Sequence, residues 1–157
     1  MSEEANKEAV RRLFNIINSR DLSRLGEVCT DDVTYRSSSG DDGVQGIDGY
    51  REELTGLFEA FPDMEMSPEE IGADGDKVYC VYRWTGTHEG EYMGITPQKH
   101  RVDLLISSNC RCRDGKVAEV VDFMDALMLL WQLGALGDEV YPGGRDWPTG
   151  ETKLRAR

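Results

Sequence analysis

The sequence predicts a single α+β domain in which helices come first and antiparallel strands follow. Apolar residues recur at helical spacing within the first 61 residues, and strand-like alternation dominates from residue 64 to about residue 125. A short and almost wholly apolar helix then closes the pattern. Three helices packed on a curved, mostly antiparallel sheet would enclose a pocket. We expect this domain to span residues 1–134 and residues 135–157 to form an irregular tail, in which Tyr141 and Trp147 are candidates for docking back onto the domain or onto a partner.

The three N-terminal helices are predicted from apolar spacing and from helix-ending signals. The first covers residues 6–19, and the third covers residues 47–61 with Asp48 as the expected N-cap and Pro62 preventing continuation. A shorter helix between them is expected to start at a cap formed by Asp21 and to end near Cys29.

The strands are predicted over residues 32–36, 64–71, 78–88, 102–112 and 116–125. The stretches between them, residues 37–43, 73–76 and 86–98, are rich in Gly, Asp or Ser and read as loops. Even-numbered residues of strand 102–112 are mostly apolar and should face the core, whereas both faces of strand 78–88 are suited to burial, so the pattern leaves open which face lines the pocket. Asp125 is the expected N-cap of a final helix over residues 126–133.

The last strand carries an ionisable group in an apolar row. Its even positions read Ala118, Val120, Asp122 and Met124. A carboxylate that loses hydration on such a face has a raised pKa, which suits proton transfer near neutrality. Asp122 is therefore the candidate acid/base, although a strand-end carboxylate bonded to a helix or to Arg83 is the structural alternative.

The hairpin before this strand decides which way Asp122 faces. A three-residue loop, Arg113-Asp114-Gly115, would pair Cys112 with Lys116, and would set Val120 opposite Ser108 and Asp122 opposite Ile106. A two-residue Asp-Gly turn would move Asp122 to the other face. We prefer the three-residue loop because it keeps the apolar row against the core.

Composition narrows the classes of partner and location. The chain has 30 acidic and 18 basic residues, a net charge of −12, which disfavours nucleic acid and anionic membranes. Because acidic residues are abundant and lysine is rare, we expect solubility in high salt and a halophilic source. No apolar run reaches membrane-spanning length and no signal region opens the chain, so a cytoplasmic location is expected. The four cysteines show no zinc-type spacing and should be reduced.

No motif points to a cofactor or a metal. The sequence lacks a phosphate-binding loop, a dinucleotide fingerprint and a His/Glu metal pair, and its two histidines cannot form a zinc site alone. An enzyme of this kind would work without a cofactor, by positioned proton transfer on a neutral small molecule.

Several segments together resemble the SnoaL-like polyketide cyclases, a branch of the NTF2-like cone fold. The resemblance covers residues 6–134 and rests on AFPDMEM at 60–66, RWTGTHEGEYMGITP at 83–97, RDGKVAEVVDFMD at 113–125 and LLWQLG at 129–134. It implies an α+β cone, a homodimer or homotetramer joined through the outer sheet face, and a cofactor-free intramolecular aldol condensation. It also implies an aspartate acid/base at Asp122 and a neighbouring histidine at the position that Ser108 occupies here. Ser108 donates a hydrogen bond but cannot relay a proton as imidazole does.

The other candidate site residues each have a structural alternative. His88 is a candidate general acid or hydrogen-bond donor at the pocket mouth, or else a residue that holds its Gly-rich loop. Arg83 could neutralise an enolate, although an ion pair with a strand neighbour is favoured. The residues that could shape an apolar substrate site, or simply belong to the core, are Tyr35, Trp84, Tyr92 and Met93.

The leading functional hypothesis is proton removal next to a carbonyl of a small apolar or aromatic substrate, followed by ring closure or isomerisation. A small-molecule carrier that uses the same pocket is the first alternative. Epoxide hydrolysis is the second, since cone-fold epoxide hydrolases use an Arg and an Asp spaced by two. Arg101 and Asp103 have that spacing here but lie on the polar face of their strand, where a solvated pair is the favoured interpretation.

Overall fold

The computed structural model of the chain describes residues 2–38 and 42–137. Its helices are α1 (Glu3–Ser19), the 3-10 helix η1 (Leu22–Arg24), α2 (Leu25–Val28), α3 (Gly46–Ala60) and α4 (Ala126–Gln132). Its strands are β1 (Cys29–Ser37), β2 (Val44–Gln45), β3 (Glu65–Asp74), β4 (Lys77–Thr87), β5 (Arg101–Arg113) and β6 (Lys116–Phe123). The predicted order of helices and strands is confirmed, with β2 as an addition. The tail with Tyr141 and Trp147 lies outside the described residues.

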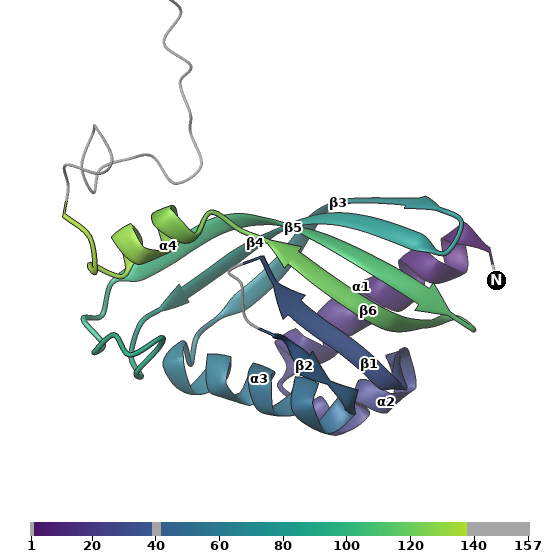
Figure 1. Ribbon diagram of the computed structural model, residues 1–157, viewed down its shortest axis with the longest axis horizontal. Helices are drawn as coiled ribbons and strands as arrows, with labels where there is room; N and C mark the ends of the chain where they lie inside the picture. The colour runs from purple at the N-terminus through teal and green to yellow at the C-terminus, as the bar shows by residue number, and fades with distance from the viewer. Residues whose placement is uncertain (1, 39–41, 138–157) are drawn as a thin grey trace, which may run out of the picture.

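The six strands form one mixed sheet in the order β2-β1-β6-β5-β4-β3. Every neighbouring pair is antiparallel except β1 and β6, which run parallel. Figure 1 shows α1, α2 and α3 against one side of the curved sheet, and α4 over the end at which β6 finishes. The α+β, cone-like class is therefore confirmed, as an open sheet covered by helices.

The core lies between α1, α3 and the inner face of the sheet. The apolar stripe of α1 is buried as predicted, through Val10, Leu13, Phe14 and Ile17. The inner face of β5 consists of its even-numbered residues, as predicted, and β4 also turns its even-numbered residues inward. On β4 the inward set includes Tyr82 and Trp84, while Tyr79 on the opposite face is 44% exposed. The sequence pattern left open which face of β4 lines the pocket, and the structure shows that it is the even-numbered face.

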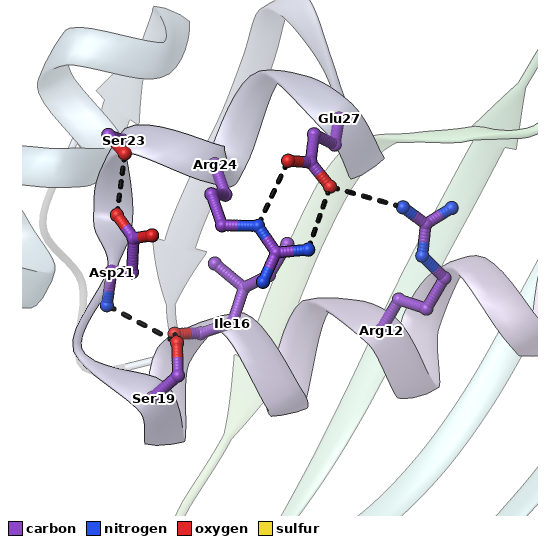
Figure 2. Close-up of polar contacts among 7 residues, drawn as sticks. All are labelled: Arg12, Ile16, Ser19, Asp21, Ser23, Arg24 and Glu27. Carbon is purple, nitrogen blue, oxygen red and sulfur yellow. Dashed lines mark hydrogen bonds and ion pairs between the residues drawn. The ribbon is translucent and has the colours of Figure 1, made fainter.

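Polar side chains hold the corner between α1 and α2 (Figure 2). The Ser23 hydroxyl donates to Asp21 Oδ1 at 2.5 Å, and the guanidinium of Arg24 binds both carboxylate oxygens of Glu27. Asp21 makes no side-chain cap to the helix that follows, so the predicted role of Asp21 is wrong in detail. Similarly, α3 begins after Gln45, and Asp48 lies in its first turn, where it pairs with Arg51. Asp125 caps α4 as predicted, by accepting from the Met128 N–H at 2.9 Å.

The hairpin between β5 and β6 differs from the prediction. Arg113 pairs with Lys116, so the loop is the two-residue turn Asp114-Gly115. Both residues have positive φ, 53° and 75°, which defines a type I′ turn, the form that matches the twist of the flanking strands. The three-residue loop and the pairing of Cys112 with Lys116 are therefore wrong.

A β-bulge nevertheless returns Asp122 to the inner face. Cys112 pairs with Val117 and Arg111 with Glu119, so Ala118 has no partner on β5. One extra residue reverses the alternation of side chains, because successive residues on a strand point to opposite faces. Beyond the bulge Ser108 pairs with Asp122, in place of the expected Ile106. The predicted orientation of Asp122 is correct, although the predicted register is not.

Candidate active site

A cavity of about 180 Å³ lies between the inner face of the sheet and the helices α1, α3 and α4. Its wall is mainly apolar and aromatic, with aromatic side chains from Phe14, Tyr35, Tyr50, Tyr82, Trp84 and Tyr92. The polar side chains in the wall belong to Ser37, Glu53, Ser108, Cys110 and Asp122. A mostly apolar cavity with a few polar groups is typical of a small-molecule site.

Asp122 lies at the end of β6 in this wall and is 5% exposed. Two serines flank it across the sheet: Ser37 pairs with it on β1, and Ser108 pairs with it on β5. The phenol of Tyr82 donates a hydrogen bond to Asp122 Oδ2 at 2.8 Å. The other carboxylate oxygen, Oδ1, has no hydrogen-bond partner within the part of the chain that the structure describes.

Burial raises the pKa of Asp122 to about 6. The nearby hydroxyls of Ser108 and Tyr82 act in the opposite direction, since they stabilise the ionised form. The carboxyl group therefore changes protonation state close to neutral pH, as a group that both accepts and returns a proton must.

The segment between β4 and β5 forms one side of the cavity. It is pinned to the end of α3, because the N–H groups of Glu89 and Gly90 both donate to the Ala60 carbonyl. A side chain at Gly90 would collide with the Glu59 carbonyl, which explains the glycine. A tight turn then brings Tyr92 and Met93 to the cavity wall, with Met93 59% exposed at its tip.

Five of the predicted substrate-site residues line this cavity: Tyr35, Trp84, Tyr92, Met93 and Ser108. Arg83 does not. It lies on the opposite face of β4, where its guanidinium pairs with Asp103 at 2.7 Å and with Glu69 at 2.9 Å. The ion pair favoured for Arg83 is therefore present, and Arg83 does not line the cavity because odd-numbered residues of β4 face away from it.

Arg101 and Asp103 also stand away from Asp122. Both are odd-numbered residues of β5, while the inward row of that strand is even-numbered. Asp103 forms its ion pair with Arg83 on the neighbouring strand β4. The sequence favoured the interpretation of Arg101 and Asp103 as a pair with each other, and the Arg83 contact replaces that interpretation. The Arg and Asp arrangement expected of an epoxide hydrolase is thus not assembled in the cavity.

His88 is fully buried but is not part of the cavity wall. Its ring stacks on Phe61 at 5.4 Å between centroids, and Phe61 in turn contacts Trp84 and Tyr92. Its backbone bonds with His100 and Lys99 close the base of the β4–β5 segment. Burial lowers the pKa of His88, which favours the neutral ring. The placement at the pocket mouth is wrong, and the geometry matches the alternative of a residue that holds its loop.

Sequence reasoning missed Tyr82, Tyr50 and Ser37 as residues of the site. Tyr82 belongs to the even-numbered row of β4, two residues from Trp84. Because Trp84 was already a candidate, its row could have indicated that Tyr82 faces the same cavity. Tyr50 occurs in the apolar pattern of α3 and stacks on Tyr35 with centroids 5.3 Å apart. Ser37 ends β1, and only the parallel pairing of β1 with β6 brings it beside Asp122.

All four cysteines are free and buried. Burial raises the pKa of Cys29 and of Cys80 to about 12 and raises that of Cys110 as well, so these thiols remain protonated and unreactive. Among the described residues, no group of three or more His, Cys, Asp or Glu side chains is arranged to hold a metal ion. None of the described helices combines the length and the apolar character needed to span a membrane.

The family model for SnoaL-like polyketide cyclases matches residues 7–133. The chain belongs to this family. No match was found among curated protein sequences. The residues that line the Asp122 cavity all lie within the matched region.

Several solved structures are similar to this chain over most of their length. A candidate SnoaL-like polyketide cyclase from Jannaschia sp. CCS1 is 28% identical with a TM-score of 0.78, over 85% of this chain and 94% of that chain. AclR from Streptomyces galilaeus, a candidate hydroxylase, is 31% identical with a TM-score of 0.74, over 87% and 89%. IdmH from Streptomyces antibioticus, a candidate polyketide cyclase, is 27% identical with a TM-score of 0.71, over 82% and 98%.

Proposed function

We propose that the protein is a cofactor-independent acid/base enzyme that cyclises or isomerises a small carbonyl compound, with Asp122 as its acid/base. The observation that carries this proposal is the carboxyl group of Asp122, buried in an apolar cavity with a pKa of about 6 and one oxygen without a hydrogen-bond partner in the described part of the chain. Family membership and similarity to candidate polyketide cyclases support the same class of reaction.

The proposed step begins with Asp122 in its ionised form. A carboxylate oxygen takes a proton from the carbon next to a carbonyl, and the electrons of the broken C–H bond form an enolate. The enolate carbon attacks a second carbonyl carbon of the same molecule and closes a ring. The alkoxide formed there takes the proton back from Asp122, so the enzyme returns to its starting state without a redox change.

The cavity wall favours a neutral substrate. Its described residues include the carboxylates of Glu53 and Asp122 and no Lys, Arg or His side chain. An anionic ligand would lose hydration there without gaining a cationic partner, which is costly. A small apolar or aromatic ketone or ester fits the six aromatic side chains of the wall better.

Hydrogen exchange at carbon tests the proposed step without knowledge of the natural product. Enolisable aromatic ketones and methyl esters are screened by thermal shift, and compounds that bind are incubated with the protein in deuterated water. We expect deuterium to enter the position next to the carbonyl, as detected by NMR, and we expect Asp122→Asn to abolish this exchange while retaining binding. Asp103→Asn, which removes a carboxylate on the outer face, is the matched control.

The same experiment separates the alternatives. A bound compound that both wild type and Asp122→Asn return without deuterium indicates a carrier and contradicts the proposal. A diol formed from an added epoxide would indicate epoxide hydrolysis. A hydroxylated product would indicate a hydroxylase, the class to which AclR is assigned as a candidate.

We also propose that two copies of the chain associate through the outer face of the sheet, either as a dimer or within a tetramer. Tyr79, Leu105 and Phe123 are 44%, 51% and 47% exposed, and all three belong to the rows of β4, β5 and β6 that point away from the cavity. Large apolar residues gathered on one face are typical of an interface. Leu105→Glu should yield a monomer in size-exclusion chromatography with light scattering, and a monomeric wild type would refute the association.

A further inference from the structure

The phenol of Tyr82 donates a hydrogen bond to the carboxylate of Asp122. The two groups are 2.8 Å apart, and both side chains are at least 95% buried, with exposed fractions of 2% for Tyr82 and 5% for Asp122. The Tyr82 ring is fixed by contact with Phe14, with centroids 5.0 Å apart. Burial raises the pKa of Tyr82 well above its usual value, so the phenol keeps its proton and remains a donor.

Proton abstraction moves negative charge within reach of this phenol. When Asp122 takes a proton from carbon, its carboxylate becomes neutral and the charge appears on the carbonyl oxygen of the substrate, two bonds from the carbon that lost the proton. A hydrogen bond to a charged acceptor is about twice as strong as one to a neutral acceptor. The phenol therefore gains by transferring its hydrogen bond from the protonated acid to the enolate oxygen.

We propose that Tyr82 is a second catalytic residue, which aims Asp122 before the reaction and donates its hydrogen bond to the enolate oxygen after proton transfer. This inference rests on the proposed function, since it needs Asp122 to act on a carbonyl compound. The Tyr82 proton stays on the phenol throughout, and the only proton that moves is the one carried by Asp122.

Tyr82 fits this role better than the polar residues beside it. The hydroxyl of Ser108 lies 3.7 Å from Cys110 Sγ and is within the sheet ladder directly opposite Asp122. Tyr82 instead reaches Asp122 from β4, two strands away, so its hydroxyl group approaches the carboxylate from the cavity side of the sheet. The donor and the acid/base therefore belong to the same cavity wall.

A binding experiment tests the donor role without turnover. Asp122→Asn mimics the protonated acid, and substituted 2-naphthols of graded acidity mimic the enolate. In Asp122→Asn we expect affinity to rise with naphthol acidity, by roughly tenfold or more across the series, because a charged acceptor strengthens the Tyr82 hydrogen bond. In Asp122→Asn combined with Tyr82→Phe we expect this rise to disappear. Equal slopes in the two proteins would overturn the proposal.

A second measurement uses the Asp122 carboxylate itself. With ¹³C-labelled aspartate, NMR titration reports the pKa of Asp122, and Tyr82→Phe should raise it because the hydrogen bond from Tyr82 stabilises the ionised form. Tyr79→Phe, which alters an exposed tyrosine on the same strand, is the matched control and should leave the Asp122 titration unchanged. An unchanged titration in Tyr82→Phe would refute the aiming role.

The experiments distinguish failure of the Tyr82 donor role from failure of the proposed reaction. If deuterium exchange is absent but the naphthol slope depends on Tyr82, the donor exists and the proposed reaction is wrong. If exchange occurs and Tyr82→Phe leaves both the slope and the exchange rate unchanged, Asp122 acts without Tyr82.

Discussion

Ser108 and Asp122 lie directly opposite each other on β5 and β6, with both side chains buried at the cavity wall. The Ser108 hydroxyl lowers the pKa of Asp122 and so offsets part of the effect of burial. The resemblance to polyketide cyclases led us to expect a histidine at the position that Ser108 occupies. The difference replaces an ionisable partner by a neutral one, so the acid/base behaviour of Asp122 depends on burial and on hydroxyl groups.

Replacing Ser108 changes the titration of Asp122 in a predictable direction. We expect Ser108→Ala to raise the Asp122 pKa, since a group that stabilises the carboxylate is lost. We expect Ser108→His to lower it at pH values where the imidazole is protonated, because a cation favours the neighbouring anion. NMR titration of labelled aspartate measures both shifts, and a lower pKa in Ser108→Ala would contradict the assignment.

Asp122→Asn should stabilise the fold while it removes activity. The folded pKa of about 6 exceeds the unfolded value near 3.8, so the folded state binds the proton more tightly. Stability from this group is fully present below pH 3.8 and is lost as pH rises through 6. At pH 8 the amide should therefore increase the free energy of unfolding, by roughly 1–3 kcal/mol.

Urea denaturation at pH 5 and pH 8 measures this effect. The gain for Asp122→Asn should be larger at pH 8. Asp103→Asn, which breaks the ion pair with Arg83 on the outer face, should show no such gain. A loss of stability in Asp122→Asn at pH 8 would mean that the ionised carboxylate is better accommodated than its burial implies.

His88 should make the fold sensitive to acid. Its pKa is lowered by burial, with a further contribution from His100, while a backbone contact with Gly90 acts in the opposite direction. Stability from a neutral buried His88 is present above the ordinary histidine pKa of 6.5 and is lost as pH falls below that value. His88→Phe preserves stacking on Phe61 and should reduce this loss.

The relevant measurement is the difference in unfolding free energy between wild type and His88→Phe from pH 7 to pH 5. Asp122 is present in both proteins, so its contribution to the pH dependence of unfolding cancels in this difference. That contribution has the opposite sign to the effect of His88 in part of this range. A difference that stays constant with pH would show that His88 does not titrate on unfolding.

Two glycines, one in the turn between β5 and β6 and one on α3, should respond in opposite directions to replacement by alanine. Gly115 has a φ of 75°, so Gly115→Ala should destabilise the protein, by about 1 kcal/mol or more. Gly56 lies on the exposed side of α3 with open space around an added Cβ, and Gly56→Ala should stabilise by roughly 0.5–1 kcal/mol. Thermal unfolding of both variants measures the effects, and stabilisation by Gly115→Ala would refute the type I′ turn.

Local patterns were sufficient for much of this fold. Helical spacing marks α1 and α3, the cap signal places α4, and alternation identifies the inward row of β5, because each depends on residues close together in the chain. The same alternation singles out Asp122, since a carboxylate interrupts an apolar row. These features follow from short-range periodicity.

Pairing across the sheet was decided only by the tertiary structure. The bulge at Ala118 returns Asp122 to the cavity after a two-residue turn, and a single strand's sequence does not show a bulge because it is defined by the partner strand. Ser37 meets Asp122 through parallel pairing, and Tyr82 reaches it from two strands away. The sequence by itself identified Asp122 as a carboxyl group within an apolar row. The packed sheet decided which side chains surround that group and how they set its pKa, because burial and hydrogen bonding both come from residues distant in the chain.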